Sequence, residues 1–286
     1  MKQLSFLLVA LILISCQQSS SGLEVLFKLP NSLKEVSGIS YNSSEKLIYS
    51  IQDRGNSNEI QVLNLDGKLI RSIKITNASN IDWEDITQDK NGNIYIGDFG
   101  NNDNERSDLT IYKISKEKLS QNQVESDYKI EFSYPEQKTF PPKKTERFYD
   151  VEGFLELNGA FYLFTKNRSK NFDGTVMIYK IKNMAGEQDA QLMGSFISCT
   201  NYNHCAITSA AISPDGQKIV LLAHDKIILF EDWEYDDLLS ANRTTISLND
   251  FSQKEAVAFL DDSTLLIADE RNKNEGGNVY KFSFKN

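Results

Sequence analysis

The sequence repeats one short pattern five times, and this repeat limits the possible folds more than any other feature. The matching units begin at Val36, Trp83, Val151, Thr208 and Glu255. Each unit reads as an apolar strand, a turn containing Asn, Gly or Asp, and a second strand rich in β-branched and aromatic residues, which together predict a β-hairpin. Two further strand-like segments follow four of the five hairpins. Four strands per repeat predict an all-β fold of the β-propeller type.

The two ends of the repeat region complement each other. After the last hairpin comes one clear strand, "NVYKFSF" at 278–284, so the final blade lacks a strand. Residues 23–29, "LEVLFKL", form a strand-like segment with no partner of its own. We expect these two segments to pair and to close a five-bladed propeller, which removes exposed sheet edges. A six-bladed ring and an open sandwich are the alternatives. A short helix is expected only at 232–242.

The N-terminal segment has the pattern of a targeting signal. Lys2 is followed by an apolar run and then by "LISC", which resembles a bacterial lipobox. The sequence therefore predicts a signal peptide at 1–16 with a lipidated Cys16, a polar tether at 17–22 and one propeller domain at 23–286. The expected location is exported and membrane-anchored, on the outer membrane or the periplasmic side, with the lipid as the membrane contact. An ordinary signal peptide with a chance cysteine is the alternative.

The two remaining cysteines stand close together in "CTNYNHC". An exported compartment is oxidising enough to join Cys199 and Cys205, so we expect a disulfide between them. Zinc binding that also uses His204 is the alternative, but a single Cys/His cluster fits zinc poorly.

The charge of the chain restricts its partners. A net charge of -9 and a pI of about 4.9 argue against nucleic acid. We expect a monomer that binds an anionic small molecule or an envelope component through a local site.

The first strand of every propeller blade lines the central channel, so the opening residues of the five units should converge on one axis. Three of these residues are carboxylates and two are hydroxyls, all hard oxygen ligands that suit calcium. The predicted metal ligands are Ser37, Glu84, Glu152, Ser209 and Glu255. The alternative is that the glutamates accept backbone hydrogen bonds or hold water, with one carboxyl protonated.

This series of one oxygen ligand per blade resembles the central calcium shell of the calcium-activated nucleotidases, the five-bladed apyrase family. The segment "SIQDRGN" at 50–56 is similar to an Asp-Arg turn of that family. The resemblance implies a five-bladed propeller, a closing strand, a central calcium ion and nucleotide hydrolysis. The first and last repeats also resemble exported phytase-like and esterase-like bacterial propellers.

Polar residues also gather in the turns after the second strand of each unit, and we expect these turns to open on the face where the channel residues enter. The same step along the chain separates Glu84 from Asp98 and Glu152 from Lys166. Arginine suits bidentate contact with phosphate or carboxylate. The candidate ligand-binding residues are Arg54, Asn101, Arg106, Lys166, Arg168, His224 and Arg271. Structural salt bridges among these loops are the alternative.

Three functions follow from these patterns. The first is a lipid-anchored propeller with a central calcium ion that binds an anionic ligand on its loop face. The second is a calcium-dependent hydrolase of phosphoanhydride or phosphoester bonds, in which Asp53, Asp98 or Glu270 activates water. The third is a platform for protein interactions in an envelope assembly. Propellers serve all three purposes.

Overall fold

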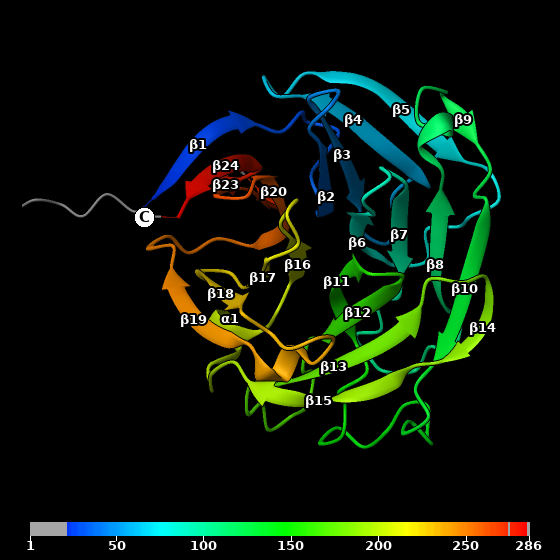
Figure 1. Ribbon diagram of the computed structural model, residues 1–286, viewed down its shortest axis with the longest axis vertical. Coiled ribbons are helices and arrows are strands. Elements are labelled where there is room, and N and C mark those ends of the chain that lie inside the picture. Colours follow the sequence, from blue (N-terminus) through cyan, green and yellow to red (C-terminus); the bar gives the residue numbers. More distant parts are fainter. Residues whose placement is uncertain (1–21, 274, 285–286) are drawn as a thin grey trace, which may run out of the picture.

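Five β-sheets form a closed ring in the computed structural model, which describes residues 22–273 and 275–284. Figure 1 looks down the ring and shows the first strand of each sheet nearest the centre. The first two blades run outward as follows: β2 (Val36–Asn42), β3 (Leu47–Gln52), β4 (Glu59–Asn64) and β5 (Leu69–Ile75); then β6 (Trp83–Gln88), β7 (Ile94–Asp98), β8 (Leu109–Ile114) and β10 (Tyr128–Ser133). The predicted five-bladed propeller is confirmed.

The remaining blades have the same antiparallel order. They consist of β11 (Val151–Leu157), β12 (Ala160–Thr165), β13 (Thr175–Lys182) and β15 (Gln191–Ile197); β16 (Ser209–Ile212), β17 (Lys218–Leu222), β18 (Lys226–Glu231) and β19 (Asn242–Ser247); and β20 (Lys254–Asp261), β21 (Thr264–Asp269), β24 (Asn278–Ser283) and β1 (Leu23–Lys28). Two short strands, β9 (Gln123–Val124) and β14 (Gly186–Asp189), extend the outer edges of the first and second blades in parallel pairing. A small hairpin joins β22 (Arg271–Asn272) to β23 (Glu275–Gly276).

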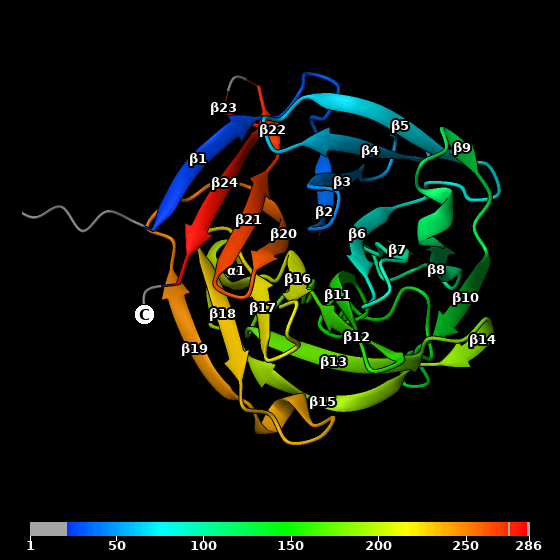
Figure 2. The same ribbon diagram turned by 45° about the horizontal axis from the view of Figure 1, so that its top comes forward.

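The ring closes between its two ends. Strand β1 pairs antiparallel with β24, with Val25 opposite Tyr280 and Lys28 opposite Asn278. Figure 2 shows β1 lying along the outside of β24. The last blade therefore takes its outer strand from the beginning of the domain, as the complementary ends of the repeat region predicted.

The hydrophobic core is divided into five clusters, one in each space between neighbouring blades. Between the first two blades, for example, Tyr49, Ile60 and Ile73 pack against Trp83 and Ile96, and all five are fully buried. Burying one large apolar side chain stabilises a fold by about 1.5–3 kcal/mol, so each seam joins its two blades firmly. Inner strands such as β11 and β12 are buried along their whole length, so they supply side chains to the core on both faces of their sheet.

The inner strands approach one another closely at the axis. A Cβ atom at Gly153 would lie 2.7 Å from the backbone of Ser209 in the next blade, which leaves room only for glycine. Close approach of this kind fixes the diameter of the channel and hence the positions of the side chains that line it.

In the part of the chain that the structure describes, helical structure is confined to three short turns. The region 232–242, where the sequence predicted a helix, contains only the 3₁₀ turn Leu238–Ser240, because a positive φ at Asp232 and Tyr235 interrupts any longer helix. A second 3₁₀ turn covers Lys116–Lys118, and one α-helical turn, α1 (Tyr202–Cys205), was not predicted. Within the described residues, no helix is long and apolar enough to cross a membrane. The predicted signal peptide and Cys16 lie outside the described residues.

Candidate functional site

Four of the five predicted channel residues occupy β-bulges. The pairing of the first two strands shifts between Val36 and Gly38 in the first blade, and equivalent shifts occur in three others. The residues left unpaired by these shifts are Ser37, Glu84, Glu152 and Glu255. Bulges turn a side chain away from the ordinary alternation of a strand and are common beside functional sites. Here they place one polar residue from each of these four blades at the same mouth of the channel.

The fourth blade differs from the repeat alignment by one residue. Ser209 pairs with Leu222 without a bulge, and the residue at the channel mouth is Thr208. The Thr208 hydroxyl donates to the Lys254 carbonyl of the next blade at 2.7 Å, just as the Ser37 hydroxyl donates to the Trp83 carbonyl at 2.7 Å. Both hydroxyls therefore join neighbouring blades. The structure places Ser209 one level deeper than the other four predicted residues.

At that deeper level Asp85 closes the channel. Its carboxylate is fully buried and accepts hydrogen bonds from the backbone N–H groups of Ile86 at 2.9 Å and Phe154 at 3.1 Å. Longer contacts come from the Ala210 N–H at 3.4 Å and the Ser209 hydroxyl at 3.3 Å. Burial outweighs these four donors and raises the pKa of Asp85 well above its ordinary value. One carboxyl group thus joins the second, third and fourth blades.

Above this level lies a cavity of about 220 Å³ with a strong excess of carboxylates. Its charged lining consists of six acids, Asp53, Asp82, Glu84, Glu152, Glu255 and Glu270, and three bases, Arg54, Lys166 and Arg168. Ser37, Asn102 and Gln253 complete the wall. Three more negative than positive groups in a confined space require additional cations or protons.

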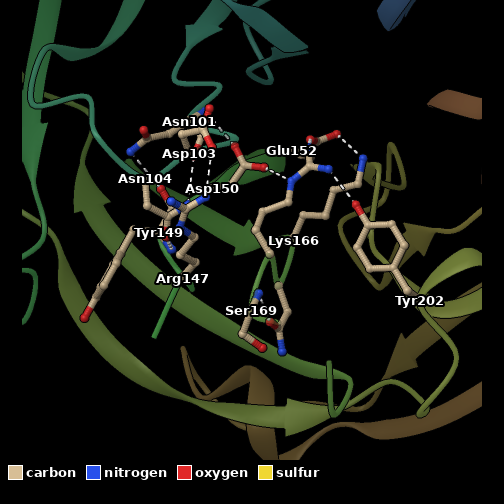
Figure 3. A network of polar contacts seen from close by, with 12 residues as sticks. Asn101, Asp103, Asn104, Arg147, Tyr149, Asp150, Glu152, Lys166, Ser169 and Tyr202 are labelled. Atoms are coloured by element: carbon tan, nitrogen blue, oxygen red, sulfur yellow. Dashed lines mark hydrogen bonds and ion pairs between the residues drawn. The ribbon is translucent and has the colours of Figure 1, made fainter. Parts of the chain in front are cut away.

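Three buried carboxylates on one side of this cavity can hold a metal ion. Oxygen atoms of Glu84, Asp150 and Glu152 lie within 4.8 Å of one another. Asp150 also accepts the backbone N–H of Asn101 at 2.6 Å, and Glu152 is in an ion pair with Lys166 at 2.8 Å. Arg168 is paired with both Asp150 and Glu152. Figure 3 labels these two carboxylates within the surrounding polar network. We call Glu84, Asp150 and Glu152 the carboxylate triad.

Glu84 is the member of the triad without a protein partner. It is 8% exposed, and no hydrogen bond or ion pair within residues 22–273 and 275–284 reaches its carboxylate. Asp82 is also buried beside it, and a side chain at Gly100 would collide with both carboxylates. Burial, followed by repulsion from Glu152 and Asp82, raises the pKa of Glu84 well above its ordinary value. This environment disfavours a bare negative charge and favours a bound cation.

Other acids of the cavity respond to the same crowding. Burial and repulsion from Glu35 and Asp82 raise the pKa of Asp53 to about 7, and burial with repulsion from Glu255 raises the pKa of Glu270 to about 8. Burial also raises the pKa of Glu152 to about 7, against the attraction of Lys166. For Glu255 the attraction of Lys166 and the hydrogen bond from His224 outweigh burial and lower its pKa.

Most of the predicted ligand-binding residues already have internal partners. Arg106 is paired with Asp98 and Asp108, and Arg271 donates to Asn31 and to the Leu29 carbonyl. The Asn101 side chain holds its own loop, because its Oδ1 accepts the Arg106 N–H at 2.9 Å. His224 contacts Glu255 at 3.3 Å.

Arg54 is the exception among the predicted ligand-binding residues. It is exposed at the cavity wall, and within the described part of the chain no hydrogen bond or ion pair reaches its guanidinium group. Of the predicted catalytic acids, Asp53 and Glu270 line the cavity, whereas Asp98 is buried in contact with Arg106 and the Asp82 N–H.

Sequence reasoning missed Asp82, Asp85 and Asp150. Asp150 and Asp82 each lie two positions before a bulged glutamate, in "DVEG" and "DWED". This shared spacing was a usable signal, because two units carry an acid at the same offset from the channel residue.

The predicted disulfide between Cys199 and Cys205 is present, with a Cα–Cα distance of 5.5 Å. It closes the loop that contains α1 and brings Tyr202 against Phe172, with ring centroids 5.3 Å apart. The loop lies beside the cavity, because the Tyr202 hydroxyl accepts a hydrogen bond from Arg168 at 2.5 Å.

The fold and the site together define a five-bladed propeller with an acid-lined channel mouth. A family model described as SdiA-regulated matches residues 23–140, which comprise β1 and the first two blades. Among curated proteins the sequence finds no match.

Solved structures with a similar fold have little sequence in common with this chain. The PQQ-bound aldose sugar dehydrogenase from Streptomyces coelicolor superposes with a TM-score of 0.53 at 10% identity, covering 91% of this chain and 97% of that one. A chain of the nidogen/laminin complex gives a TM-score of 0.47 at 12% identity, covering 83% of this chain and 73% of that one. These similarities concern the fold alone.

Proposed function

We propose that this propeller binds calcium at the mouth of its channel and that the loaded site takes a small anionic ligand. The observation that carries this proposal is the unpartnered, buried Glu84 carboxylate in a cavity that has six acids and three bases. A divalent cation balances most of that excess. The triad of Glu84, Asp150 and Glu152 would hold it, with Asp82 as an additional oxygen donor beside Glu84.

The chemistry of the donors favours calcium over softer metals. Every candidate ligand is a carboxylate, and calcium takes six to eight oxygen ligands in flexible geometries. Zinc and copper prefer sites with imidazole or thiolate, and the triad contains neither. A calcium ion also suits an exported protein, because extracellular modules bind calcium in the range of roughly 10⁻⁴–10⁻³ M.

An anionic ligand is supported by Arg54 and by the ion itself. A bound calcium ion would reverse the sign of the local electrostatic potential, and an oxygen atom of an anionic ligand could coordinate it in the cavity. Arg54 is exposed on the same wall, has no partner for its guanidinium group among the described residues, and can donate to a phosphate or carboxylate. A cavity of about 220 Å³ admits one such charged group, while the rest of a larger ligand would lie outside on the loops.

A second candidate function is calcium-dependent hydrolysis of a phosphoester or phosphoanhydride. The specific observation in its favour is the pair of cavity acids with raised pKa values, about 7 for Asp53 and about 8 for Glu270. Groups that titrate near neutral pH can take and return a proton during attack by water. The calcium ion would polarise the phosphoryl oxygen of the substrate.

The remaining parts of the proposal concern location and partners. Lipidation at Cys16 would anchor the propeller to a membrane as an exported protein, acting as a monomer whose loop face stays open to its ligand. A protein partner on that face is the alternative to a small anion. The net charge of -9 makes nucleic acid an unsuitable partner.

Thermal unfolding in calcium and in chelator tests the proposed site. Binding to the native state raises the melting temperature, so the wild-type protein should melt higher in millimolar calcium than in EGTA. Glu84→Gln should lose most of this difference because it removes an unshared ligand. Glu131→Gln is the matched control, because Glu131 is half-exposed on strand β10, away from the cavity, and forms an ion pair with Lys129. Equal melting in calcium and EGTA for the wild-type protein would refute the calcium site.

A screen for phosphate release distinguishes the two candidate functions. Nucleoside di- and triphosphates and simple phosphomonoesters are incubated with the protein, with calcium and with chelator. Calcium-dependent release that is lost in Asp53→Asn or Glu270→Gln supports the hydrolase. Binding without release supports the ligand-binding function.

A further inference from the structure

Arg168 links the carboxylate triad to the disulfide-closed loop. Its guanidinium group is paired with Asp150 and Glu152 on one side and donates to the Tyr202 hydroxyl at 2.5 Å on the other. Figure 3 shows the Asp150 and Glu152 carboxylates within this network and Tyr202 at one end of it. One side chain therefore contacts both the candidate metal ligands and a separate loop.

The loop that supplies Tyr202 is firmly held. The Cys199–Cys205 disulfide closes it, and the Ser198 hydroxyl donates to the Cys205 carbonyl at 2.8 Å. His204 contacts Asp225 of the fourth blade at 2.6 Å. The Tyr202 hydroxyl is therefore a fixed acceptor at the rim of the cavity.

Arg168 and a metal ion need the same oxygen atoms. Arg168 and Lys166 occupy both oxygens of Glu152, and Arg168 also takes one oxygen of Asp150. A divalent ion in the triad would bind these oxygens directly and would repel the two nearby cations. The ion and the guanidinium group cannot both keep full contact with the triad.

We propose that Arg168 is an internal cation that competes with calcium for the carboxylate triad, and that calcium binding releases its guanidinium group from the triad while its contact with Tyr202 remains. This inference rests on the proposed calcium site and adds that Arg168 regulates calcium binding there. Without calcium, Arg168 neutralises the triad and stabilises the empty site. With calcium, Arg168 keeps the Tyr202 hydroxyl as its partner, so occupancy of the site is coupled to the disulfide-closed loop.

Calorimetric titration of the full chain with calcium alone tests the competition. Arg168→Met should bind calcium more tightly, on the order of tenfold or more, because it frees two carboxylate oxygens and removes a like charge. Tyr202→Phe should bind calcium more weakly, by roughly two- to threefold, because the contact with Tyr202, which Arg168 already makes in the empty site, becomes the main protein contact of the released guanidinium group. Arg271→Met is the control: it removes the same charge from the same face, but Arg271 contacts Asn31 and Leu29 instead of the triad.

The outcomes separate this inference from the calcium site itself. If the wild-type protein binds calcium while Arg168→Met binds equally or more weakly, the competition is refuted and the calcium site stands. If neither protein binds calcium, the proposed function fails and the competition fails with it. If Arg168→Met folds only in calcium, this supports the competition. If it folds under neither condition, Tyr202→Phe decides, and unchanged affinity in that variant refutes the coupling.

Discussion

Replacing Asp85 by alanine should destabilise the propeller strongly, because one carboxyl group provides acceptors for three blades. The two close donors are the backbone N–H groups of Ile86 at 2.9 Å and Phe154 at 3.1 Å. A buried donor left without an acceptor costs about 1–3 kcal/mol, so these two alone give a loss of about 2–6 kcal/mol in the free energy of unfolding. At about 2–4 °C per kcal/mol for a domain of this size, the melting temperature should fall by roughly 4–24 °C.

Asp85→Asn provides an internal comparison. Its amide oxygen can accept from Phe154 and Ala210 while its NH₂ group donates to the Ser209 hydroxyl, which leaves only the Ile86 N–H without an acceptor. The expected loss is about 1–3 kcal/mol, towards the lower end because the neutral amide avoids burying a charge.

Urea denaturation followed by tryptophan fluorescence measures both losses. Asp103→Ala is the surface control, because Asp103 is 68% exposed in an ion pair with Arg147 and such pairs contribute little. An Asp85→Ala protein that is as stable as Asp85→Asn, or within about 1 kcal/mol of wild type, would refute the role of Asp85 as the acceptor that joins the blades.

Three further predictions concern pH, closure and the blade seams. In chelator, the melting temperature should fall as pH rises from 5.5 to 8.5. Asp53 and Glu270 have folded-state pKa values of about 7 and 8, above their unfolded values, so their stabilising contribution is lost as pH rises through these values. A melting temperature that rises steadily over this range would contradict the assignment. Removing residues 23–28 while keeping the preceding tether should lower the melting temperature and cause concentration-dependent association in light scattering. The reason is that the deletion exposes the edge of the last blade. A stable monomer would count against closure by this strand. Thr208→Val should cost about 1–2 kcal/mol in urea denaturation by removing a hydrogen bond between blades, and no measurable loss would contradict the seam role given to this hydroxyl.

The repeat pattern predicted the ring because each blade is a local unit whose strands follow one another along the chain. The pairing of 23–29 with 278–284 could be predicted for a related reason, since each segment lacked a partner nearby. The Cys199–Cys205 bond could be predicted from the closeness of the two cysteines in the sequence and from the oxidising compartment that we expected for an exported chain.

The register of the fourth blade shows where sequence reasoning stops. In "TSAAI" the residues near the channel are all small, so the apolar pattern could not set the register of this strand. Because this blade has no bulge, Thr208 and not Ser209 lies at the channel mouth. The partners of Arg168 were equally hidden, because Asp150 and Tyr202 come from loops of different blades and meet it only in the folded ring. Sequence could identify the charged residues of the loop face but not which of them neutralise one another.

A crystal structure of the full chain grown in millimolar calcium, with anomalous diffraction data, tests the calcium site most directly. The proposal predicts one anomalous peak among Glu84, Asp150 and Glu152, at about 2.3–2.6 Å from their oxygen atoms. It also predicts that Arg168 will have left the triad and kept its contact with Tyr202. Crystals that show no peak there, with Arg168 and Lys166 still paired to Glu152, would contradict the proposal.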